Sequence, residues 1–347
     1  LKRGFVMPPK TKFTREEIIE ILTDESDDNL SLLCSDAHRI RVENRGESIF
    51  LRALIEFSNR CQKNCLYCGL RSSNIDTSRY ILSEDQIIAC AVKSYNSGYG
   101  SIVLQSGERR DREFISFVTK VIKEIKRFSD NKLGITLSCG EQNEETYREW
   151  FEAGAHRYLL RFETSKEENY YRLHPKDRFH SYSDRINAIK TLKKIGYMTG
   201  SGFMYNLPNE RVEDIADNLL FLKELNVDMV GMGPYIPHHE TPLYEERNLV
   251  RLKEKSYIMK LALKSIAILR HLMPHINIAS TTALQVIDNQ GREKALASGA
   301  NVLMPNLTPD TLRENYSIYD NKPGVKEDSE LISLPFPIAY NEWGDTI

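Results

Sequence analysis

The residues whose types and spacing can do chemistry are three cysteines that lie close together. Cys61, Cys65 and Cys68 form a C-x3-C-x2-C motif directly after the apolar residues 51–57. Iron-sulfur clusters and structural zinc sites held by cysteine normally have four protein ligands. Three thiolates are one ligand short, and a 4Fe-4S cluster held by three cysteines keeps one iron open to a substrate. The motif therefore predicts a 4Fe-4S cluster with an open coordination site.

Two other interpretations of the motif are an incomplete zinc site and three unrelated buried thiols. A structural zinc site would need a fourth Cys or His close by, and none lies between residues 51 and 83 besides the triad. The remaining cysteines, Cys34, Cys90 and Cys139, are scattered and are predicted to pack in the core. For Cys139 a role at the proposed site is the alternative, because it falls at a predicted strand end near that site.

The composition indicates a globular enzyme without a strong charge bias. The chain has 347 residues and a formal net charge of -2, so it gives no reason to expect nucleic acid or an anionic membrane as a partner. No apolar run approaches the roughly 18 residues of a membrane-spanning helix. An oxygen-sensitive cluster and unpaired thiols favour a reducing compartment, so we expect a cytoplasmic protein. Residues 1–10 are expected to be a flexible extension, with Met7 as a native start.

Short apolar runs alternate with longer amphipathic segments, which is typical of a parallel sheet covered on both faces. The predicted strands are residues 51–58, 101–106, 134–139, 157–164, 197–205, 228–235, 276–281 and 301–306. The predicted helices are residues 83–96, 112–128, 144–153, 183–195, 212–225, 250–272 and 284–298. Ser83 and Gln86 form a predicted capping box, and Gly154 and Gly196 follow predicted helix ends. The pattern predicts an α/β fold, a (β/α)8 TIM-type barrel.

We expect three parts in the chain. Residues 1–50 form an N-terminal extension with helices, residues 51–310 form the barrel, and residues 311–347 form a C-terminal tail that closes it. A doubly wound open sheet is the alternative, but it would place a ligand crevice at one switch point. Here polar residues follow all eight predicted strands, and the active sites of TIM barrels lie at that rim.

The cysteine motif, with the aromatic Tyr67 before its last cysteine, resembles the signature of the radical S-adenosylmethionine (SAM) enzymes. In those enzymes the amine and carboxylate of SAM bind the open iron, and an electron from the cluster cleaves SAM to a 5'-deoxyadenosyl radical. The resemblance implies a 4Fe-4S cluster and SAM as cofactors, and an external electron donor as a partner. Cys61, Cys65 and Cys68 are then the catalytic residues and the metal ligands.

Other residues at the rim fit the groups of SAM. Ser106, Gly107 and Glu108 follow the second strand and resemble the GGE segment that receives the methionyl ammonium. Glu163 can accept hydrogen bonds from both ribose hydroxyls, and Arg185 can pair with the SAM carboxylate. A solvent-facing helix arginine is the alternative for Arg185. The predicted cofactor-binding residues are Tyr67, Ser106, Gly107, Glu108, Ser138, Glu163 and Arg185.

Arg161 lies two residues before Glu163, so on a strand both side chains face the barrel interior. A buried cation is costly unless it is paired. Arg161 therefore either forms an ion pair with Glu163 or binds an anionic substrate carboxylate, and we favour the second. Thr281 and Thr282, at the end of the seventh strand, can complete this substrate-binding site, with a β-branched strand end as the alternative.

Beyond these motifs, the chain closely resembles the HydE family, the radical SAM maturases of FeFe-hydrogenase. The likeness spans residues 51–309 and is carried by residues 52–59, 63–71, 102–108, 157–161, 228–234, 236–238 and 304–306. It implies adenosyl-radical attack on a sulfur-containing substrate inside a closed cavity. In that family the substrate is a cysteine-bound iron complex with CO and cyanide, and other hydrogenase maturation proteins are possible partners. Relatives include methylornithine synthase (PylB), biotin synthase and the HydE-like HmdB proteins.

The chain departs from the family pattern in three places. No cysteine follows Cys139, so an accessory C-terminal cluster of the kind found in many HydE proteins is excluded. A turn that is often G-L-P-G-Q reads N-L-P-N-E at residues 206–210, and Phe162 replaces a common histidine. The last two changes can indicate a different substrate. A PylB-like carbon-skeleton rearrangement and a non-catalytic iron-sulfur scaffold or carrier therefore stay open as alternatives.

Overall fold

The structure is a computed structural model that describes residues 13–251, 254–322 and 334–344. The extension expected at residues 1–10, with Met7, lies outside the described residues. Eight parallel strands follow one another in a single sheet in the order β10-β1-β2-β3-β4-β5-β7-β9. The strands of this path are β1 (Ile49–Ser58), β2 (Ser101–Ser106), β3 (Gly134–Ser138), β4 (Arg157–Leu159), β5 (Met198–Ser201), β7 (Met229–Val230), β9 (Asn277–Ile278) and β10 (Val302–Leu303).

The first and last strands of this path meet through backbone hydrogen bonds. Ser280 N–H donates to the Val302 carbonyl at 2.9 Å, and Asn301 N–H donates to the Ile278 carbonyl at 3.0 Å. These bonds join the segments around β9 and β10, so the sheet curls into a nearly closed barrel. The predicted (β/α)8 barrel is confirmed, and the open doubly wound sheet is excluded.

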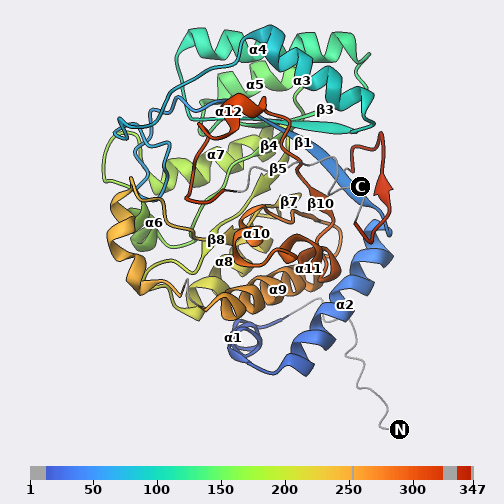
Figure 1. The fold of residues 1–347 in the computed structure, drawn as a ribbon, viewed down its shortest axis with the longest axis vertical. Coiled ribbons are helices and arrows are strands. Elements are labelled where there is room, and N and C mark those ends of the chain that lie inside the picture. The colour runs from blue at the N-terminus through green and yellow to red at the C-terminus, as the bar shows by residue number, and fades with distance from the viewer. Residues whose placement is uncertain (1–12, 252–253, 323–333, 345–347) are drawn as a thin grey trace.

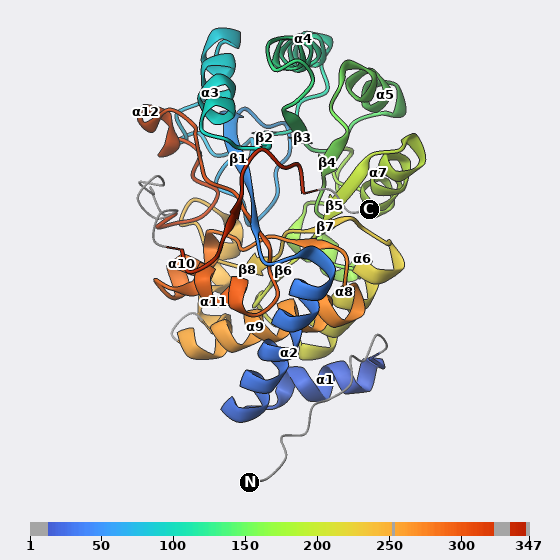
Figure 2. The same ribbon diagram turned by 90° about the vertical axis from the view of Figure 1, so that its right-hand side faces the viewer.

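Helices surround the strands on the outside of the barrel (Figures 1 and 2). They are α3 (Glu84–Asn96), α4 (Arg112–Phe128), α5 (Glu144–Ala153), α6 (Glu167–Leu173), α7 (Tyr182–Ile195), α8 (Val212–Glu224), α9 (Lys255–Leu272), α10 (Ala283–Ile287), α11 (Gly291–Ala297) and α12 (Asp310–Arg313). The predicted capping box is confirmed: Ser83 accepts from the Gln86 N–H, and the Gln86 side chain accepts from the Ser83 N–H. Gly154 and Gly196 cap α5 and α7 with φ of 118° and 110°, as the predicted helix ends required.

The register of β1 and β2 brings the ends of these strands together. Arg52 of β1 pairs with Ser101 of β2, and the pairing continues to Ser58 and Ser106 across an irregularity after Glu56. Because both strands end at the same edge, the loop after β1 and the turn after β2 start side by side. The cysteine motif and the segment Ser106 to Glu108 therefore share one corner of the rim.

Several elements in the second half of the chain differ from the prediction. The expected strands 197–205 and 228–235 each divide, and their second parts, β6 (Met204–Tyr205) and β8 (Gly233–Pro234), form a separate pair. The expected helix 284–298 is broken between α10 and α11, where the Asp288 side chain accepts from the Gln290 N–H at 2.8 Å. The expected helix 250–272 begins only at Lys255, after the 3-10 helix η1 (Pro242–Leu249), and α6 was not predicted.

Two helices precede the barrel strands in the described part of the chain. In Figure 2, α1 (Arg15–Thr23) lies below α8 and α9, and α2 (Asp27–Arg45) runs in front of α9. α1 packs on α8 and α9, while α2 packs on α9 and α11. No helix in the described ranges has the length and apolar character needed to cross a membrane.

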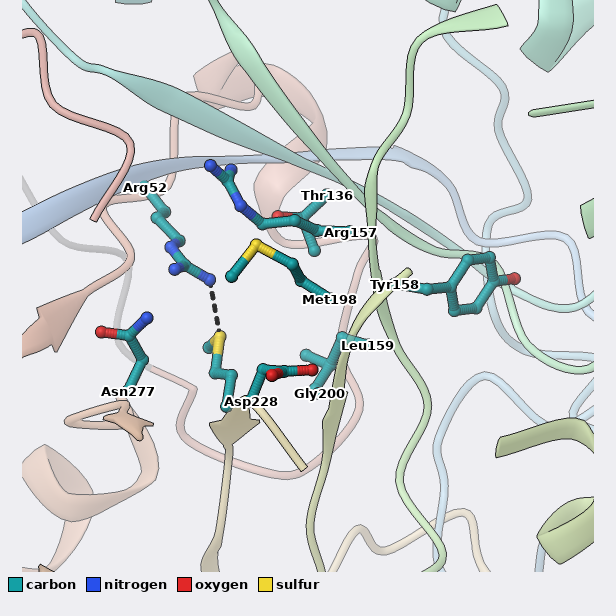
Figure 3. A pocket seen from close by; sticks show the side chains of 10 residues that line it. Arg52, Thr136, Arg157, Tyr158, Leu159, Met198, Gly200, Asp228 and Asn277 are labelled. Atoms are coloured by element: carbon teal, nitrogen blue, oxygen red, sulfur yellow. Dashed lines mark hydrogen bonds between the residues drawn. The ribbon is translucent and has the colours of Figure 1, made fainter. Parts of the chain in front are cut away.

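The end of the barrel opposite the rim is filled by polar side chains around a small cavity (Figure 3). Arg52 of β1 lies beside the Met229 sulfur, with Nη1 and Sδ 2.7 Å apart. Arg157, Asp228 and Asn277 also line this cavity. Strand β11 (Ile338–Ala339) pairs with β1, and the Gly344 carbonyl accepts from the Asn277 amide at 2.7 Å. The end of the C-terminal tail thus covers this side of the barrel.

Candidate active site

The cysteine motif lies in the loop after β1, which is held in place by backbone hydrogen bonds to three distant parts of the chain. The donors and acceptors are Gln62 N–H to the Glu108 carbonyl at 2.8 Å, Leu66 N–H to the Leu173 carbonyl at 2.9 Å, and Gly69 N–H to the Ile318 carbonyl at 3.2 Å. The turn after β2, the end of α6 and the C-terminal tail therefore fix this loop together.

Arg79 organises the same loop from within. Its guanidinium donates to four backbone carbonyls, at distances between 2.6 and 3.0 Å: those of Asn59, Leu70, Arg71 and Asn74. Hydrogen bonds from a charged donor are stronger than neutral ones, so this single side chain joins the beginning of the loop to its end. Sequence reasoning missed Arg79, because one arginine among small polar residues carries no pattern.

The three thiols lie close enough to influence one another. Burial raises the pKa of Cys61, Cys65 and Cys68, and for Cys65 and Cys68 the charge of a neighbouring cysteine raises it further. The pKa of Cys68 rises to about 12. Thiols of this kind are protonated at neutral pH, and binding a metal releases the protons. The Sγ of Cys61 also accepts from the Glu108 N–H at 3.3 Å, a contact that orients this sulfur.

The fold brings a histidine near the motif that is not its neighbour in sequence. His180 Nε2 lies 3.9 Å from the Cys65 Sγ, so it must be considered as a fourth ligand. Nε2 accepts the Asn64 N–H at 3.1 Å, and Nδ1 lies 2.7 Å from an Asp177 carboxylate oxygen. Because the lone pair on Nε2 is used by the loop itself, His180 supports the loop and is not placed as a ligand. The donor set remains three thiols, which fits a 4Fe-4S cluster with one open iron.

Gly107 is a glycine for a steric reason. A Cβ at this position would lie 2.5 Å from the Arg60 carbonyl oxygen and 2.7 Å from the Cys61 Cβ. The Gly107 N–H donates to the Ser58 carbonyl at 2.9 Å, and the Ser106 hydroxyl donates to the Gly107 carbonyl at 2.8 Å. The segment predicted from its likeness to GGE thus forms the bed on which the cysteine loop lies.

Glu108 belongs to a group of charges, all buried except the exposed Arg110, that also contains Lys63, Glu141 and Arg185. Its carboxylate lies 2.8 Å from Arg110 Nη2 and 3.6 Å from Lys63 Nζ, and it accepts from the Glu141 N–H at 2.8 Å. Glu108 is therefore at the predicted place, but its oxygens already have partners within the chain. Burial raises the pKa of Glu108, and Lys63 opposes this shift.

Arg185 is buried on α7 and does not face solvent, so the alternative of an exposed helix arginine is wrong. Its Nε donates to the Glu141 carboxylate, and its Nη1 donates to the Arg161 carbonyl at 2.7 Å. Within the described residues its Nη2 makes no hydrogen bond, so this edge is open to a ligand. Sequence reasoning noted Glu141 only as a polar strand end, and it missed Lys63.

The expected strand 157–164 ends at Leu159, so Arg161 and Glu163 lie in the segment after β4 and not on the strand, but their side chains still meet. Arg161 Nη2 lies 2.9 Å from Glu163 Oε2, which is the ion pair that the sequence left open. Glu163 has φ of 68°, an uncommon conformation for a non-glycine residue, and such strain is often found at functional sites. Phe162 between them is fully buried and packs on Phe203 and Phe221. Its side chain therefore joins the packing on α8 and is part of the core.

The remaining predicted residues lie around the same rim. Thr281 Oγ1 donates to the Met232 carbonyl at 3.2 Å, and Thr282 Oγ1 is 3.2 Å from the Tyr319 hydroxyl. Neither hydroxyl contacts Arg161 in the described structure, so these contacts support the structural alternative at least as well as a substrate site. Ser138 ends β3 and pairs with Gln105 of β2. The ring of Tyr67 packs edge-on against His174 at 5.5 Å.

The first part of the C-terminal tail crosses the rim and inserts side chains there. The Tyr316 hydroxyl accepts from the Gln105 amide at 3.2 Å, and the Asn315 carbonyl accepts from the Asn59 amide at 2.7 Å. Lys322 Nζ lies 2.5 Å from a Glu56 carboxylate oxygen, and Glu56 is buried on β1. Residues 315–322, which we call the rim segment, thus cover the mouth of the barrel beside the cysteine loop.

A second group of ligand-type side chains lies outside this site. Side-chain atoms of His238, His239 and Asp320 are all within 4.8 Å of one another. The two imidazole rings are stacked with an interplanar angle of 9°, so their lone pairs run parallel and do not converge. His238 Nδ1 accepts the Glu240 N–H at 3.1 Å, and His239 Nδ1 lies 2.8 Å from Asp320. These contacts join the loop after β8 to the rim segment.

Comparisons with known proteins agree with this geometry. Residues 55–222 match the model of the Radical SAM superfamily. The chain is 42% identical to the FeFe hydrogenase maturase subunit HydE of Thermotoga maritima over 314 residues, which is 90% of this chain and 86% of that protein. It is 29% identical to the 3-methylornithine synthase of Methanosarcina acetivorans over 307 residues, 88% of this chain and 83% of that protein.

Solved structures show the same fold. Methylornithine synthase (PylB) matches with a TM-score of 0.80 and 25% identity, covering 95% of both chains. The hydrogenase maturase HydG matches with a TM-score of 0.74 and 20% identity, covering 93% of this chain and 71% of that chain, and this likeness concerns the fold alone.

A near-closed parallel barrel with a loop of three cysteines at its rim defines a radical SAM enzyme, and the chain belongs to that superfamily. Within the superfamily it belongs to the HydE family. Enzymes of this class use a 4Fe-4S cluster and SAM, and the residues present fit both groups.

Proposed function

We propose that this radical SAM enzyme acts in the maturation of a hydrogenase active-site cofactor, on a small sulfur- or carboxylate-bearing substrate or an iron complex. The observation that carries the proposal is the loop of three thiols fixed over Gly107 at the rim of a closed barrel, in a chain 42% identical to HydE. We assign the enzyme to the cytoplasm. Its partners are an external electron donor and other maturation proteins.

The cluster is assigned to Cys61, Cys65 and Cys68. When bound, the cluster supplies the electron that cleaves SAM to a 5'-deoxyadenosyl radical. The residues of the chain hold and orient the cluster and SAM. The Glu108 N–H orients the Cys61 sulfur at 3.3 Å. The charges of both signs around Glu108 favour a ligand that carries both an ammonium and a carboxylate. SAM carries both on its methionyl end.

The SAM contacts are assigned by position on the rim. Glu108 and the backbone carbonyls of Ser106 and Gly107 are assigned to the ammonium, which requires Glu108 to exchange one of its present partners, and the open Nη2 of Arg185 is assigned to the carboxylate. Glu163 is assigned to the ribose hydroxyls, which a carboxylate can accept together. Tyr67 and Ser138 are assigned to the binding of the same cofactor.

Arg161, Thr281 and Thr282 are proposed to bind an anionic substrate. Arg161 Nη2 lies 2.9 Å from Glu163 Oε2, and Arg161 Nε is buried without a hydrogen bond. A substrate carboxylate would therefore give Nε a partner that the ion pair does not supply. For Thr281 and Thr282, binding requires that the hydroxyls exchange their present partners, the Met232 carbonyl and Tyr319.

Enclosure is the other requirement of the chemistry, since a primary carbon radical abstracts hydrogen from most side chains. The rim segment lies over the barrel mouth, and the tail around β11 covers the opposite end. Both parts keep water and stray hydrogen donors away from the lumen.

The test is maturation of an FeFe-hydrogenase in vitro. The apo-hydrogenase is incubated anaerobically with the other FeFe-hydrogenase maturases, and the HydE component is replaced by this protein. We expect H2 evolution that depends on SAM and is lost in the Cys61→Ala, Cys65→Ala, Cys68→Ala variant. Absence of H2 evolution, with a HydE control active in the same mixture, would contradict the proposed role.

A carbon-skeleton rearrangement is the second candidate, because the PylB structure matches with a TM-score of 0.80 over 95% of the chain. Formation of 3-methylornithine, measured by mass spectrometry in a reaction with SAM and a reductant, would favour it over hydrogenase maturation. A non-catalytic iron-sulfur carrier would instead bind the cluster without consuming SAM.

A further inference from the structure

Glu141, at the end of β3, is the centre of the group of charges beside the cysteine loop. One carboxylate oxygen accepts from Arg185 Nε. The other lies 3.0 Å from Lys63 Nζ and 2.9 Å from Arg110 Nη2. No other carboxylate described in this structure holds three cations that come from the cysteine loop, the turn after β2 and helix α7.

The burial of this group makes its pairing decisive. The side chains of Glu141, Glu108 and Lys63 are each 3 to 4% exposed, and a buried charge without a partner is very costly. Burial alone would raise the pKa of Glu141, but Arg185 and Lys63 lower it to about 2. Glu141 is therefore ionised at neutral pH.

The direction of the Arg185 guanidinium follows from these contacts. Its Nε is fixed by Glu141 and its Nη1 by the Arg161 carbonyl at 2.7 Å. A planar guanidinium held at two nitrogens cannot rotate, so the position of Nη2 is determined by Glu141 and the end of β4.

Lys63 connects the contacts of Glu141 and Arg185 to the metal site. It lies between Cys61 and Cys65 in the chain, and its Nζ contacts Glu141 at 3.0 Å and the Phe179 carbonyl. One carboxylate thus holds both the cysteine loop and the arginine that is assigned to the SAM carboxylate.

We propose that Glu141 is a positioning residue that fixes Arg185 relative to the cysteine loop. When a ligand chelates the open iron, Nη2 of Arg185 is then in position to bind the carboxylate of that ligand. The proposal rests on the assignment of SAM to this site. Glu141 itself does not touch the reacting atoms, and it acts through Arg185 and Lys63.

The test compares Glu141→Gln with Glu144→Gln in protein reconstituted anaerobically with iron and sulfide. Glu144, three residues after Glu141, is a matched control. It also pairs with an arginine, Arg148, at 2.6 Å, but this pair lies at the surface. The readouts are iron content, the EPR spectrum of the reduced cluster, and the SAM concentration that half-converts that spectrum to its SAM-bound form.

We expect Glu141→Gln to retain the cluster and its SAM-free spectrum, and to require about 10 to 100 times more SAM, as is typical when a supporting partner of a ligand is removed. Glu144→Gln should match the wild type. A purely structural role would lower iron content or thermal stability and leave the SAM dependence of the loaded fraction unchanged.

A double-mutant comparison shows whether Glu141 acts through Arg185. Arg185→Ala should weaken SAM binding by itself, and adding Glu141→Gln should then cost little more, because the residue to be positioned is gone. Full additivity of the two losses would overturn the proposal. If Glu141→Gln loses its cluster, Glu141→Asp, which keeps the charge on a shorter side chain, must load iron fully and still weaken SAM binding.

These outcomes are separate from the proposed function. If the wild type shows no SAM-dependent change in its spectrum, the assignment of SAM fails. If the wild type responds to SAM and Glu141→Gln responds at the same concentration, the assignment stands and the positioning role of Glu141 is wrong.

Discussion

Gly107 lies directly beneath the cysteine loop, and the distances around it leave no room for a side chain. A Cβ would meet the Arg60 carbonyl oxygen at 2.5 Å and the Cys61 Cβ at 2.7 Å. Both contacts are with backbone or with the start of a ligand side chain, so neither neighbour can move without displacing the loop.

Gly107→Ala should therefore lower the free energy of unfolding by about 1 to 3 kcal/mol, as overpacking generally does, and should reduce the iron retained after reconstitution. Urea unfolding of the apo-protein and iron analysis measure the two effects. Gly231→Ala is the control, because a Cβ there has no neighbour within 4 Å. Equal stability and iron content of both variants would contradict the role given to Gly107.

The departure at residues 206–210 has a physical explanation. Asn206 and Asn209, which stand where relatives often have glycine, have φ of 61° and 56°. Asparagine adopts this left-handed conformation more readily than most residues, so the turn is kept without glycine. Burial raises the pKa of Glu210, at the position of the usual glutamine, to about 8. A protonated Glu210 is neutral, like glutamine.

This shift predicts a pH dependence of stability. The pKa of Glu210 in the folded protein is about 8 against an ordinary value of 4.5, so its contribution is full below pH 4.5 and is lost as the pH rises to 8. Glu210→Gln should remove this loss. Because the side chain is partly exposed, we expect the variant to be more stable than the wild type by about 1 to 3 kcal/mol at pH 8.5.

Urea unfolding at a series of pH values from 4.5 to 8.5, at constant ionic strength, measures the difference between the two proteins. Parallel stability curves for the wild type and Glu210→Gln would show that Glu210 ionises normally.

At the residue scale, the sequence predicted the parts of the site that depend on local spacing. The three cysteines and the segment Ser106 to Glu108 needed only their positions after strands. Lys63, Glu141 and Arg79 could not be found in this way, because their roles depend on contacts between segments that are far apart in the sequence, such as Lys63 with Glu141 and with the Phe179 carbonyl.

Among the elements, the rim segment makes one ion pair with a side chain of the barrel strands. Lys322 Nζ reaches Glu56 Oε1 at 2.5 Å, and the Asn306 amide donates to the other oxygen at 2.9 Å. Glu56 is 1% exposed on β1, so Lys322 supplies the positive charge for a buried carboxylate. The lysine thereby ties the tail to the inside of the barrel.

Lys322→Met should lower the free energy of unfolding by about 3 to 5 kcal/mol, because it leaves the Glu56 carboxylate buried without its cation. The double variant Glu56→Gln, Lys322→Met should recover part of this loss, since no charge remains unpaired. Chemical denaturation measures both.

Lys294→Met is the matched control. Lys294 pairs with Asp288 at 2.6 Å but is 44% exposed, and a surface pair contributes about 1 kcal/mol or less. If Lys322→Met costs no more than Lys294→Met, the ion pair does not hold the rim segment.

At the element scale, long regular segments were predicted well and interrupted ones were not. β1 and α4 agree with the expected ranges within a few residues, because their apolar patterns are continuous. The strands expected at 197–205 and 228–235 divide because Gly202 and Gly231 approach closely: a Cβ on Gly202 would lie 2.0 Å from the Gly231 carbonyl oxygen. The sequence of either segment alone does not predict such an approach, because it depends on how the two strands are placed.

In the whole molecule, described parts of the C-terminal tail contact the barrel near both of its ends. Residues 315–322 cross the rim, and β11 pairs with β1 near the opposite end. The alternation of strands and helices was sufficient to predict the barrel. The path of the tail was not, because its contacts are made by single polar side chains and a strand of two residues.

Two of the departures from the HydE pattern, Phe162 and residues 206–210, can be placed in the fold. Phe162 is part of the packing between β4 and α8, and the turn at residues 206–210 keeps its backbone form. Both changes are therefore accommodated without a change of the barrel fold.

The most direct measurement is the amount of 5'-deoxyadenosine formed when the anaerobically reconstituted protein is mixed with dithionite and SAM. We expect 5'-deoxyadenosine from the wild type, and none above background from Cys65→Ala, which removes one of the three cluster ligands. Retention of 5'-deoxyadenosine formation in Cys65→Ala, or its absence in wild-type protein with a full complement of iron and sulfide, would contradict the account.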